Sequence, residues 1–154
     1  MSPTRPEVRP LRLAVVLGQL DRGGSEGQAL ELARGLAARG LAVQLFSFRD
    51  GPRRGETDLP CRVPVFPFAG RGFFACLAWL REFRPDVAYT FGARAHSWGR
   101  LAARLAGVPR LLVGYRQQRD YCLDRFTLRW NAAVVCNARI VAERVARRYR
   151  LPPE

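Results

Sequence analysis

The chain has 154 residues, 48% of them hydrophobic and 25% charged, which is typical of one folded domain and excludes a disordered segment. All 26 basic residues are arginine, and they outnumber the 13 acidic residues to give a formal net charge of +13. This excess favours anionic partners, with GC-rich coding bias as an equal alternative, but its even spread argues against nucleic acid.

The chain is organised around a strand, a glycine turn and a helix near its N-terminus. Residues 1–10 hold three prolines and predict a flexible tail, and the apolar run Leu13–Leu17 predicts a buried strand. Gly23 and Gly24 can adopt backbone angles closed to other residues and allow close approach, while Ser25 is expected to cap the helix. A helix N-terminus opened by two glycines indicates an anion-binding geometry.

Strands and helices then alternate along the chain. Further strands are predicted at 41–48, 62–68, 86–91, 110–115 and 132–136, and helices at 73–83, 94–106, 120–130 and 138–149. Gly40 is expected to end the first helix, and Pro64 and Pro67 place their strand at a sheet edge. The helix at 94–106 is expected to bury Trp98, Leu101, Ala102 and Leu105. This alternation predicts a single α/β domain with a doubly wound, Rossmann-like parallel sheet and helices on both faces.

The four cysteines do not predict a metal or redox site. None forms a C-x-x-C pair, so we expect neither a metal nor another cofactor, and Cys76 and Cys136 are expected in the core. No apolar run approaches the ~18 residues of a membrane span. We therefore expect a cytoplasmic protein, with contact at the inner face of the membrane as an open alternative.

Three strand-to-helix turns carry arginine. In a parallel sheet these turns meet at one edge, so Arg94, Arg116 and Arg139 are expected to surround the glycine turn and bind phosphate oxygens. The alternative is that the arginines only solvate the rim. His96, the single histidine, could carry a proton there, although solvation on a helix face is the favoured interpretation.

The segment Arg71–Arg84 mixes aromatic residues with arginine at both ends. Such a helix suits an anionic membrane interface, and packing on the sheet would produce the same pattern.

Three stretches in this order resemble the N-terminal domain of family-4 glycosyltransferases of the GT-B fold. The first is GGSEGQALELARGLAARGLAVQLFSF, the second RPDVAYTFGARAHSWGRLAARLAGVPRLLVGYR, and the third AAVVCNARIVAERVARRYRLPPE. The resemblance implies a glycosyltransferase domain over 11–150 and, at 151–154, the start of a linker to a C-terminal domain.

The resemblance also implies retaining transfer of a sugar from a nucleotide-sugar donor to a glycan or lipid-linked acceptor. In that family the N-terminal domain mainly holds the acceptor, and most of the donor lies in a second domain that carries two glutamates eight positions apart. No pair of glutamates here has that spacing. We therefore expect the chain to be inactive alone and to act with a C-terminal domain in trans. The alternative is a non-catalytic module that binds an anionic glycan, lipid or nucleotide through its arginine-rich rim.

The family's functional positions map onto few residues of this chain. Its glycine turn faces the donor phosphates, which implies that role for Gly23 and Gly24, and Asn137 matches a frequent asparagine. Phe91 and Arg116 stand roughly where many members have a donor-facing histidine. The expected substrate-binding residues are Arg94, Arg116, Asn137 and Arg139, and no catalytic residue is assigned.

Overall fold

The structure is a computed structural model that describes residues 9–64, 69–116 and 123–151. Most of the predicted tail and linker lie outside these described residues, as do Asp120 and Cys122. The strands are β1 Arg12–Leu17, β2 Ala42–Ser47, β3 Cys61–Arg62, β4 Val87–Phe91, β5 Arg110–Tyr115 and β6 Ala133–Cys136. The α-helices are α1 Gly24–Ala37, α2 Ala69–Phe83, α3 Arg100–Leu105, α4 Asp124–Thr127 and α5 Arg139–Tyr149.

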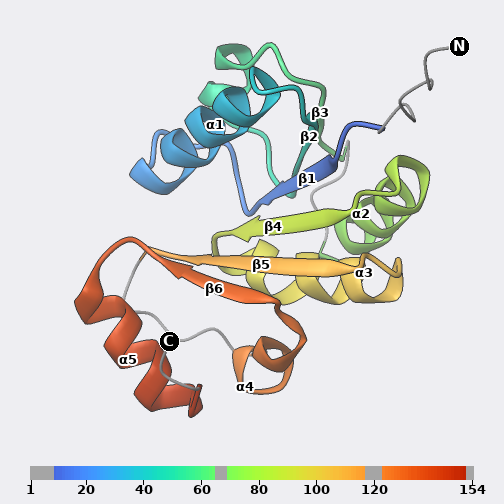
Figure 1. Ribbon diagram of the computed structural model, residues 1–154. Helices are drawn as coiled ribbons and strands as arrows, with labels where there is room; N and C mark the ends of the chain where they lie inside the picture. Colours follow the sequence, from blue (N-terminus) through green and yellow to red (C-terminus); the bar gives the residue numbers. More distant parts are fainter. Residues whose placement is uncertain (1–8, 65–68, 117–122, 152–154) are drawn as a thin grey trace, which may run out of the picture.

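The six strands form one parallel sheet in the order β3-β2-β1-β4-β5-β6 (Figure 1). β1 is central and pairs along its length with β2 on one side and β4 on the other. β3 pairs at the edge through Cys61 and Arg62, which confirms the edge position of a strand that begins one residue earlier than predicted. The doubly wound parallel sheet predicted from the sequence is therefore confirmed.

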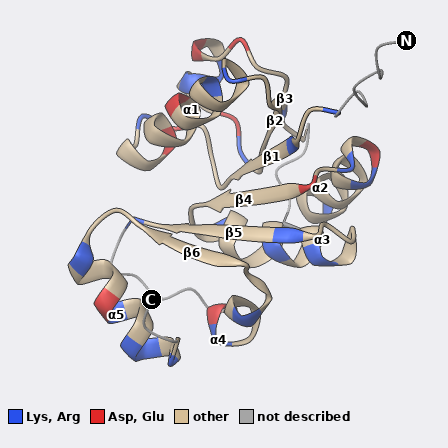
Figure 2. Ribbon diagram, in the orientation of Figure 1, with Lys and Arg blue, Asp and Glu red and all other residues tan. Residues whose placement is uncertain are grey.

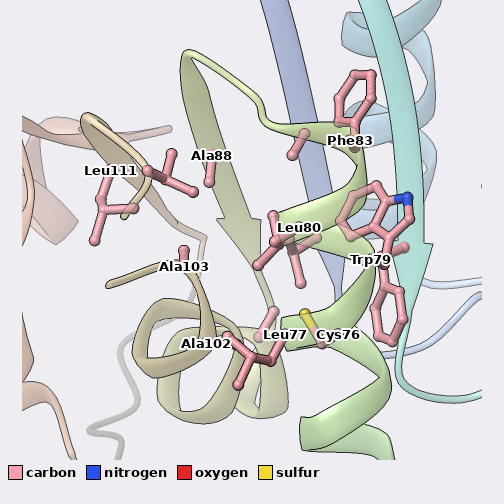
Figure 3. Close-up of a cluster of buried hydrophobic side chains, with 14 of the residues drawn as sticks. Cys76, Leu77, Trp79, Leu80, Phe83, Ala88, Ala102, Ala103 and Leu111 are labelled. Atoms are coloured by element: carbon pink, nitrogen blue, oxygen red, sulfur yellow. The ribbon is translucent and has the colours of Figure 1, made fainter. Parts of the chain in front are cut away.

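Helices cover both faces of this sheet. α1 packs on one face through Ala29, Leu30 and Ala33, against alternate residues of β1, β2 and β4. On the opposite face α2 and α3 enclose a second cluster, in which Trp79 stacks on Phe83 with ring centroids 5.9 Å apart (Figure 3). α5 packs on β5 and β6, at the β6 end of the sheet. The carboxyl ends of the central strands therefore lie between two faces of the sheet that helices cover.

The first helix ends earlier than predicted, because α1 stops at Ala37 with Ala38 as its C-cap, and Gly40 lies in the turn that follows. The φ of Gly40 is +88°, its N–H donates to the Ala37 carbonyl at 2.9 Å, and the Leu41 N–H donates to the Leu36 carbonyl at 3.2 Å. This left-handed turn satisfies the last carbonyls of α1 and leads the chain into β2.

The predicted helix at 94–106 is not continuous, because a π-helical turn over Ala95–Gly99 precedes α3. The predicted buried face was wrong for two residues: Trp98 is 40% exposed and Leu105 is 54% exposed. A π-helical turn holds more residues than an α-helical one and so rotates the helix face that follows. Gly99 permits this turn, since a Cβ there would lie only 2.9 Å from Val16 Cγ1.

Two other segments differ from prediction in detail. The predicted helix at 120–130 is present as the short α4 followed by a 3₁₀ turn over Leu128–Trp130, with 120–122 outside the described residues. Cys76 is fully buried in α2 as expected, whereas Cys136 is only half-buried.

Candidate functional site

The candidate site lies where the carboxyl ends of β1 and β4 meet. From this point the chain turns outward to α1 in one direction and to the π-helical turn in the other, and such a switch point leaves a crevice for ligands. The Gly18 N–H donates to the Phe91 carbonyl at 2.9 Å, and Gly92 follows with φ +85°. The two strand ends are thereby held together by backbone contacts.

The glycine turn opens α1 directly above this junction. Gly23 is the N-cap and no side chain caps the helix, so the expected cap at Ser25 was wrong. Gly23 has φ −68°, and Gly24 is not among the residues with positive φ, so neither requires unusual backbone angles. At Gly24 the turn leaves room for another group to approach the backbone, because a Cβ there would have no heavy atom within 4 Å.

The Glu26 carboxylate already lies at one point of this helix N-terminus. A Cβ on Gly23 would be 2.2 Å from Glu26 Oε2, so the carboxylate rests against the N-cap backbone. An anion at that position is favoured by the positive end of the helix dipole. Gly24, one residue further along, remains open to a second anionic group.

Arg116 reaches this helix from the end of β5. One of its Nη atoms donates to the Gln28 side chain, and its Cζ lies 5.6 Å from the centroid of the Phe91 ring. Its Nε is buried without a hydrogen-bond partner among the described residues. Gly114 makes room for this stack, since a Cβ there would lie 2.8 Å from the Phe91 ring. Arg116 and Phe91, two positions singled out in the sequence, are therefore in contact beside α1.

The other three predicted residues lie at different places along the same edge. Arg94 is exposed just after the β4 turn, and its backbone nitrogen lies 3.7 Å from the position of a Gly18 Cβ. Asn137 and Arg139 are exposed beyond β6, three strand spacings or about 14 Å from β1. Arg139 forms a 2.9 Å ion pair with Glu143 on its own helix. Of the four predicted residues, Arg116 thus contacts α1, and Arg94 lies at the junction of β1 and β4.

Arg53 is a further basic residue at α1 that the sequence did not indicate. It belongs to a 3₁₀ turn over Pro52–Glu56, and its guanidinium lies 3.3 Å from the position of a Gly27 Cβ. Its N–H donates to the Leu20 carbonyl at 3.1 Å, which fixes the turn against the segment between β1 and α1. The residue of the sequence that could have indicated this turn is Gly51, because a Cβ there would lie 2.1 Å from the Leu20 carbonyl oxygen.

His96 is buried, so the solvated position favoured from the sequence was wrong. It is 1% exposed, and its Nε2 lies 3.1 Å from the Gly114 carbonyl oxygen. Burial, followed by the nearby positive charge of Arg100, lowers the pKa of His96 to about 3. The ring is therefore neutral near pH 7 and is held by the core rather than presented to a ligand.

Most of the aromatic face of α2 packs on the sheet, as the alternative to the membrane interpretation predicted. Its second turn differs, because Phe74 is 66% exposed and contacts Phe73, whose ring in turn lies 5.9 Å from that of Trp98. These three residues form the aromatic patch. No helix within the described parts of the chain is both long enough and apolar enough to cross a bilayer.

Charged residues occur on several helices of the fold (Figure 2). Basic positions occur on α1, α2, α3 and α5 rather than on a single face. Within the residues that the structure describes, no group of three or more His, Cys, Asp or Glu side chains is arranged to hold a metal ion. The local charge at the glycine turn therefore comes from the Glu26 carboxylate, from nearby arginine and from the helix end.

Two hollows among the described residues lie away from the glycine turn. One of about 530 Å³ is lined partly by Arg81, Arg84 and Pro109, at the amino ends of β4 and β5. Another of about 400 Å³ is lined by Arg125, Arg148, Tyr149 and Arg150, near the end of α5. Neither of these two hollows is lined by Gly23 or Gly24.

Known structures with the same fold include glycosyltransferases of the GT-B class. MurG from Acinetobacter baumannii aligns with a TM-score of 0.66 at 20% identity over 84% of this chain. The lipopolysaccharide outer core galactosyltransferase WaaB aligns with a TM-score of 0.67 at 11% identity over 90% of this chain. HepE from Anabaena, solved with UDP and glucose, aligns with 0.61 at 16% identity over 87% of this chain. The chain spans 42% of the length of MurG and of WaaB, and 40% of that of HepE.

These likenesses establish the fold, a Rossmann-like half of a GT-B structure. No curated protein sequence matches the chain. The sequence model of Glycosyltransferase Family 4 matches residues 22–154, which is most of the chain and confirms the resemblance seen in its three motifs. The chain therefore belongs to Glycosyltransferase Family 4.

Proposed function

We propose that this chain forms the acceptor side of a retaining glycosyltransferase and presents α1 to the phosphates of a nucleotide-sugar donor. The observation that carries the proposal is the open N-terminus of α1 at Gly24, beside the β1–β4 switch point. Backbone N–H groups at that terminus favour phosphate oxygens. Arg94 and Arg116 add fixed positive charge on the β4 and β5 sides of the turn.

The proposed transfer requires a second wall above this open surface. Charge that develops on a departing nucleotide is stabilised by groups held in place on both sides of a cleft. Because the chain spans 42% of the length of MurG and WaaB, we assign most donor binding to a second domain and expect no transfer by this chain alone. Mixing the chain with a matched, folded donor-binding domain should restore transfer, and persistent inactivity of that mixture would count against the proposal.

Nucleotide-sugar donors and glycan or lipid-linked acceptors are the proposed substrates. Family membership and the UDP and glucose bound by HepE support a nucleotide-sugar donor. Asn137 and Arg139, exposed beyond β6, are assigned to acceptor contacts because they lie too far from the glycine turn to share one phosphate.

Gly24→Ala tests the anion site without disturbing the helix. Nothing lies near the added methyl group, so stability should change by less than about 0.5 kcal/mol. The methyl group would nevertheless stand where the anion approaches, and we expect pyrophosphate to bind at least about tenfold more weakly, a loss of roughly 1.4 kcal/mol. Isothermal titration of the whole chain with pyrophosphate measures this.

Gly35→Ala is the matched control, because it makes the same change in the same helix about 16 Å from the glycine turn. It should leave pyrophosphate affinity unchanged. Equal weakening in both variants, or no binding by the unaltered chain, would reject an anion site at Gly24. Salt-sensitive binding of an anionic glycan with no transfer by the mixture of domains would favour the non-catalytic alternative.

We also propose that the aromatic patch contacts the cytoplasmic face of the membrane. Phe73, Phe74 and Trp98 are neighbours near the carboxyl edge of the sheet, and the exposed Arg71 and Arg94 lie close to them in the chain. Aromatic rings partition into the headgroup region, and each nearby arginine adds about 1 kcal/mol of attraction to an anionic surface. Such contact would bring a lipid-linked acceptor to the candidate site.

Phe74→Ser should lower sedimentation with vesicles of phosphatidylglycerol and phosphatidylcholine. Phe126→Ser is the control, since Phe126 is 57% exposed on α4 and is not one of the three residues of the patch. The membrane proposal fails if both variants sediment with the vesicles to the same extent, or if the unaltered chain does not sediment with them.

A further inference from the structure

Four polar side chains are buried together beneath the carboxyl ends of β4 and β5. Arg100, from α3, donates one Nη to the Asp124 carboxylate, and the Tyr115 hydroxyl donates to the other oxygen of Asp124. Arg100 and Asp124 are each fully buried. Arg100 also donates its Nε to the His96 carbonyl, and His96 Nε2 lies 3.1 Å from the Gly114 carbonyl oxygen.

The network holds the last two residues of β5 from two directions. The His96 ring contacts Gly114 from the π-helical turn, and Asp124 binds Tyr115 from α4. Burial, and then Asp124, raise the pKa of Tyr115 above its ordinary value, so its hydroxyl stays protonated and can donate. The end of β5 is therefore fixed by two other elements in addition to its neighbouring strands.

Stability alone does not account for this arrangement. A buried ion pair gains little over well-packed apolar residues, because removing both charges from water is costly. Here Arg100 Nη1 is also buried without a hydrogen-bond partner among the described residues, which adds a further cost. A network of this kind is better explained by the geometry that it enforces.

That geometry affects Arg116, the next residue after Tyr115. Successive side chains of a strand point to opposite faces, so fixing Tyr115 on the side of α5 sets the direction of Arg116 on the side of α1. Arg116 there bonds Gln28 and lies over Phe91. We propose that Arg100, Asp124 and Tyr115 are positioning residues that hold the Arg116 guanidinium at the first turns of α1.

The experiment follows the order of the Arg116 side chain by ¹⁵N relaxation of its Nε–Hε group, assigned from the signal lost in Arg116→Lys. Tyr115→Phe removes one hydroxyl and keeps the ring. We expect the Arg116 order parameter to fall toward the value of the exposed Arg94. Asp124→Asn weakens the hydrogen bond to Arg100 at nearly constant side-chain volume and should lower the Arg116 order parameter in the same way. This variant replaces Tyr115→Phe in the experiment if Tyr115→Phe is poorly folded.

Leu128→Ala is the control for a purely structural role. Leu128 lies in the same buried cluster as Tyr115 and is 4% exposed, so its truncation destabilises the same region by about 2–5 kcal/mol. Its Arg116 order parameter should remain as in the unaltered chain. The inference is overturned if Tyr115→Phe and Asp124→Asn leave Arg116 ordered, or if Leu128→Ala disorders it equally.

The inference rests on the proposed function only in the role that it gives to Arg116. Pyrophosphate titration of the same variants separates the two. Loss of Arg116 order in a chain that never binds pyrophosphate would reject the proposed anion site and leave the positioning role standing. Loss of both order and affinity in Tyr115→Phe, with neither lost in Leu128→Ala, supports both.

Discussion

At the scale of single residues, His96 links the stability of the fold to pH. Its pKa is about 3 when folded because of burial and the neighbouring Arg100 charge, against an ordinary value of 6.5 that applies to the unfolded chain. Between these two values the unfolded chain binds the extra proton. The contribution of His96 is therefore fully present above pH 6.5 and is lost as the pH falls toward 3.

From this difference we expect the free energy of unfolding to drop by about 2 kcal/mol between pH 7 and pH 5 because of His96 alone. Urea unfolding of the chain and of His96→Gln at both pH values isolates the effect from the carboxylates. The variant should lose less stability than the unaltered chain over this interval. An equal loss of unfolding free energy in both proteins would show that protonating His96 does not destabilise the fold.

Residues that follow strands directly were predictable from the sequence. The edge at which Gly23, Gly24, Arg94 and Arg116 lie could be predicted because a parallel sheet brings all its strand-to-helix turns together. Their binding roles stay predictions. Arg53 and Asp124 were missed because their positions depend on contacts with segments distant in the sequence. Gly51 is a local sign of the turn that carries Arg53, but the contact between Asp124 and Arg100 has no local pattern.

At the scale of elements, two glycines near the C-terminal end of α1 have opposite conformational requirements. Gly40 has φ +88°, which disfavours any residue with a Cβ, whereas Gly35 lies within the helix, where alanine is preferred. Gly40→Ala should therefore lower the free energy of unfolding by at least about 1 kcal/mol, and Gly35→Ala should raise it by roughly 0.5–1 kcal/mol.

Denaturant unfolding of the two single variants and the double variant measures these values. Gly35 lies within α1 and Gly40 in the turn that follows it, so the effects of the two substitutions should add within about 0.5 kcal/mol. A stable Gly40→Ala would mean that the turn after α1 can adopt another conformation.

The strands were predicted more accurately than the helices, for a physical reason. Buried parallel strands appear as short apolar runs bounded by glycine or charge, and β1, β4 and β5 follow these runs closely. Helical faces were inferred from a period of 3.6 residues, which fails once the π-helical turn shifts the register before α3. In that segment Gly99 is required by contact with β1, which local sequence does not express.

At the scale of the whole molecule, an excess of 13 positive charges opposes compaction. Among the described residues, most ion pairs are exposed, as are Arg34–Glu31 and Arg139–Glu143, and such pairs contribute little. Salt should therefore weaken the repulsion among the excess arginines more than it weakens the attraction within the exposed ion pairs. We expect the midpoint of urea unfolding to rise between 10 and 200 mM NaCl, and a falling midpoint would contradict this balance.

The central position of β1 also determines the order in which the sheet can be completed during synthesis. β1 pairs first with β2, which lies in the same N-terminal stretch, but its other edge waits for β4, whose last residue is Phe91. At 5–20 residues per second, the 44 residues between the ends of β2 and β4 delay that pairing by roughly 2–9 s. For those seconds the most apolar strand of the nascent chain presents one unpaired edge, and this interval is when the protein is most exposed to aggregation and most dependent on chaperones.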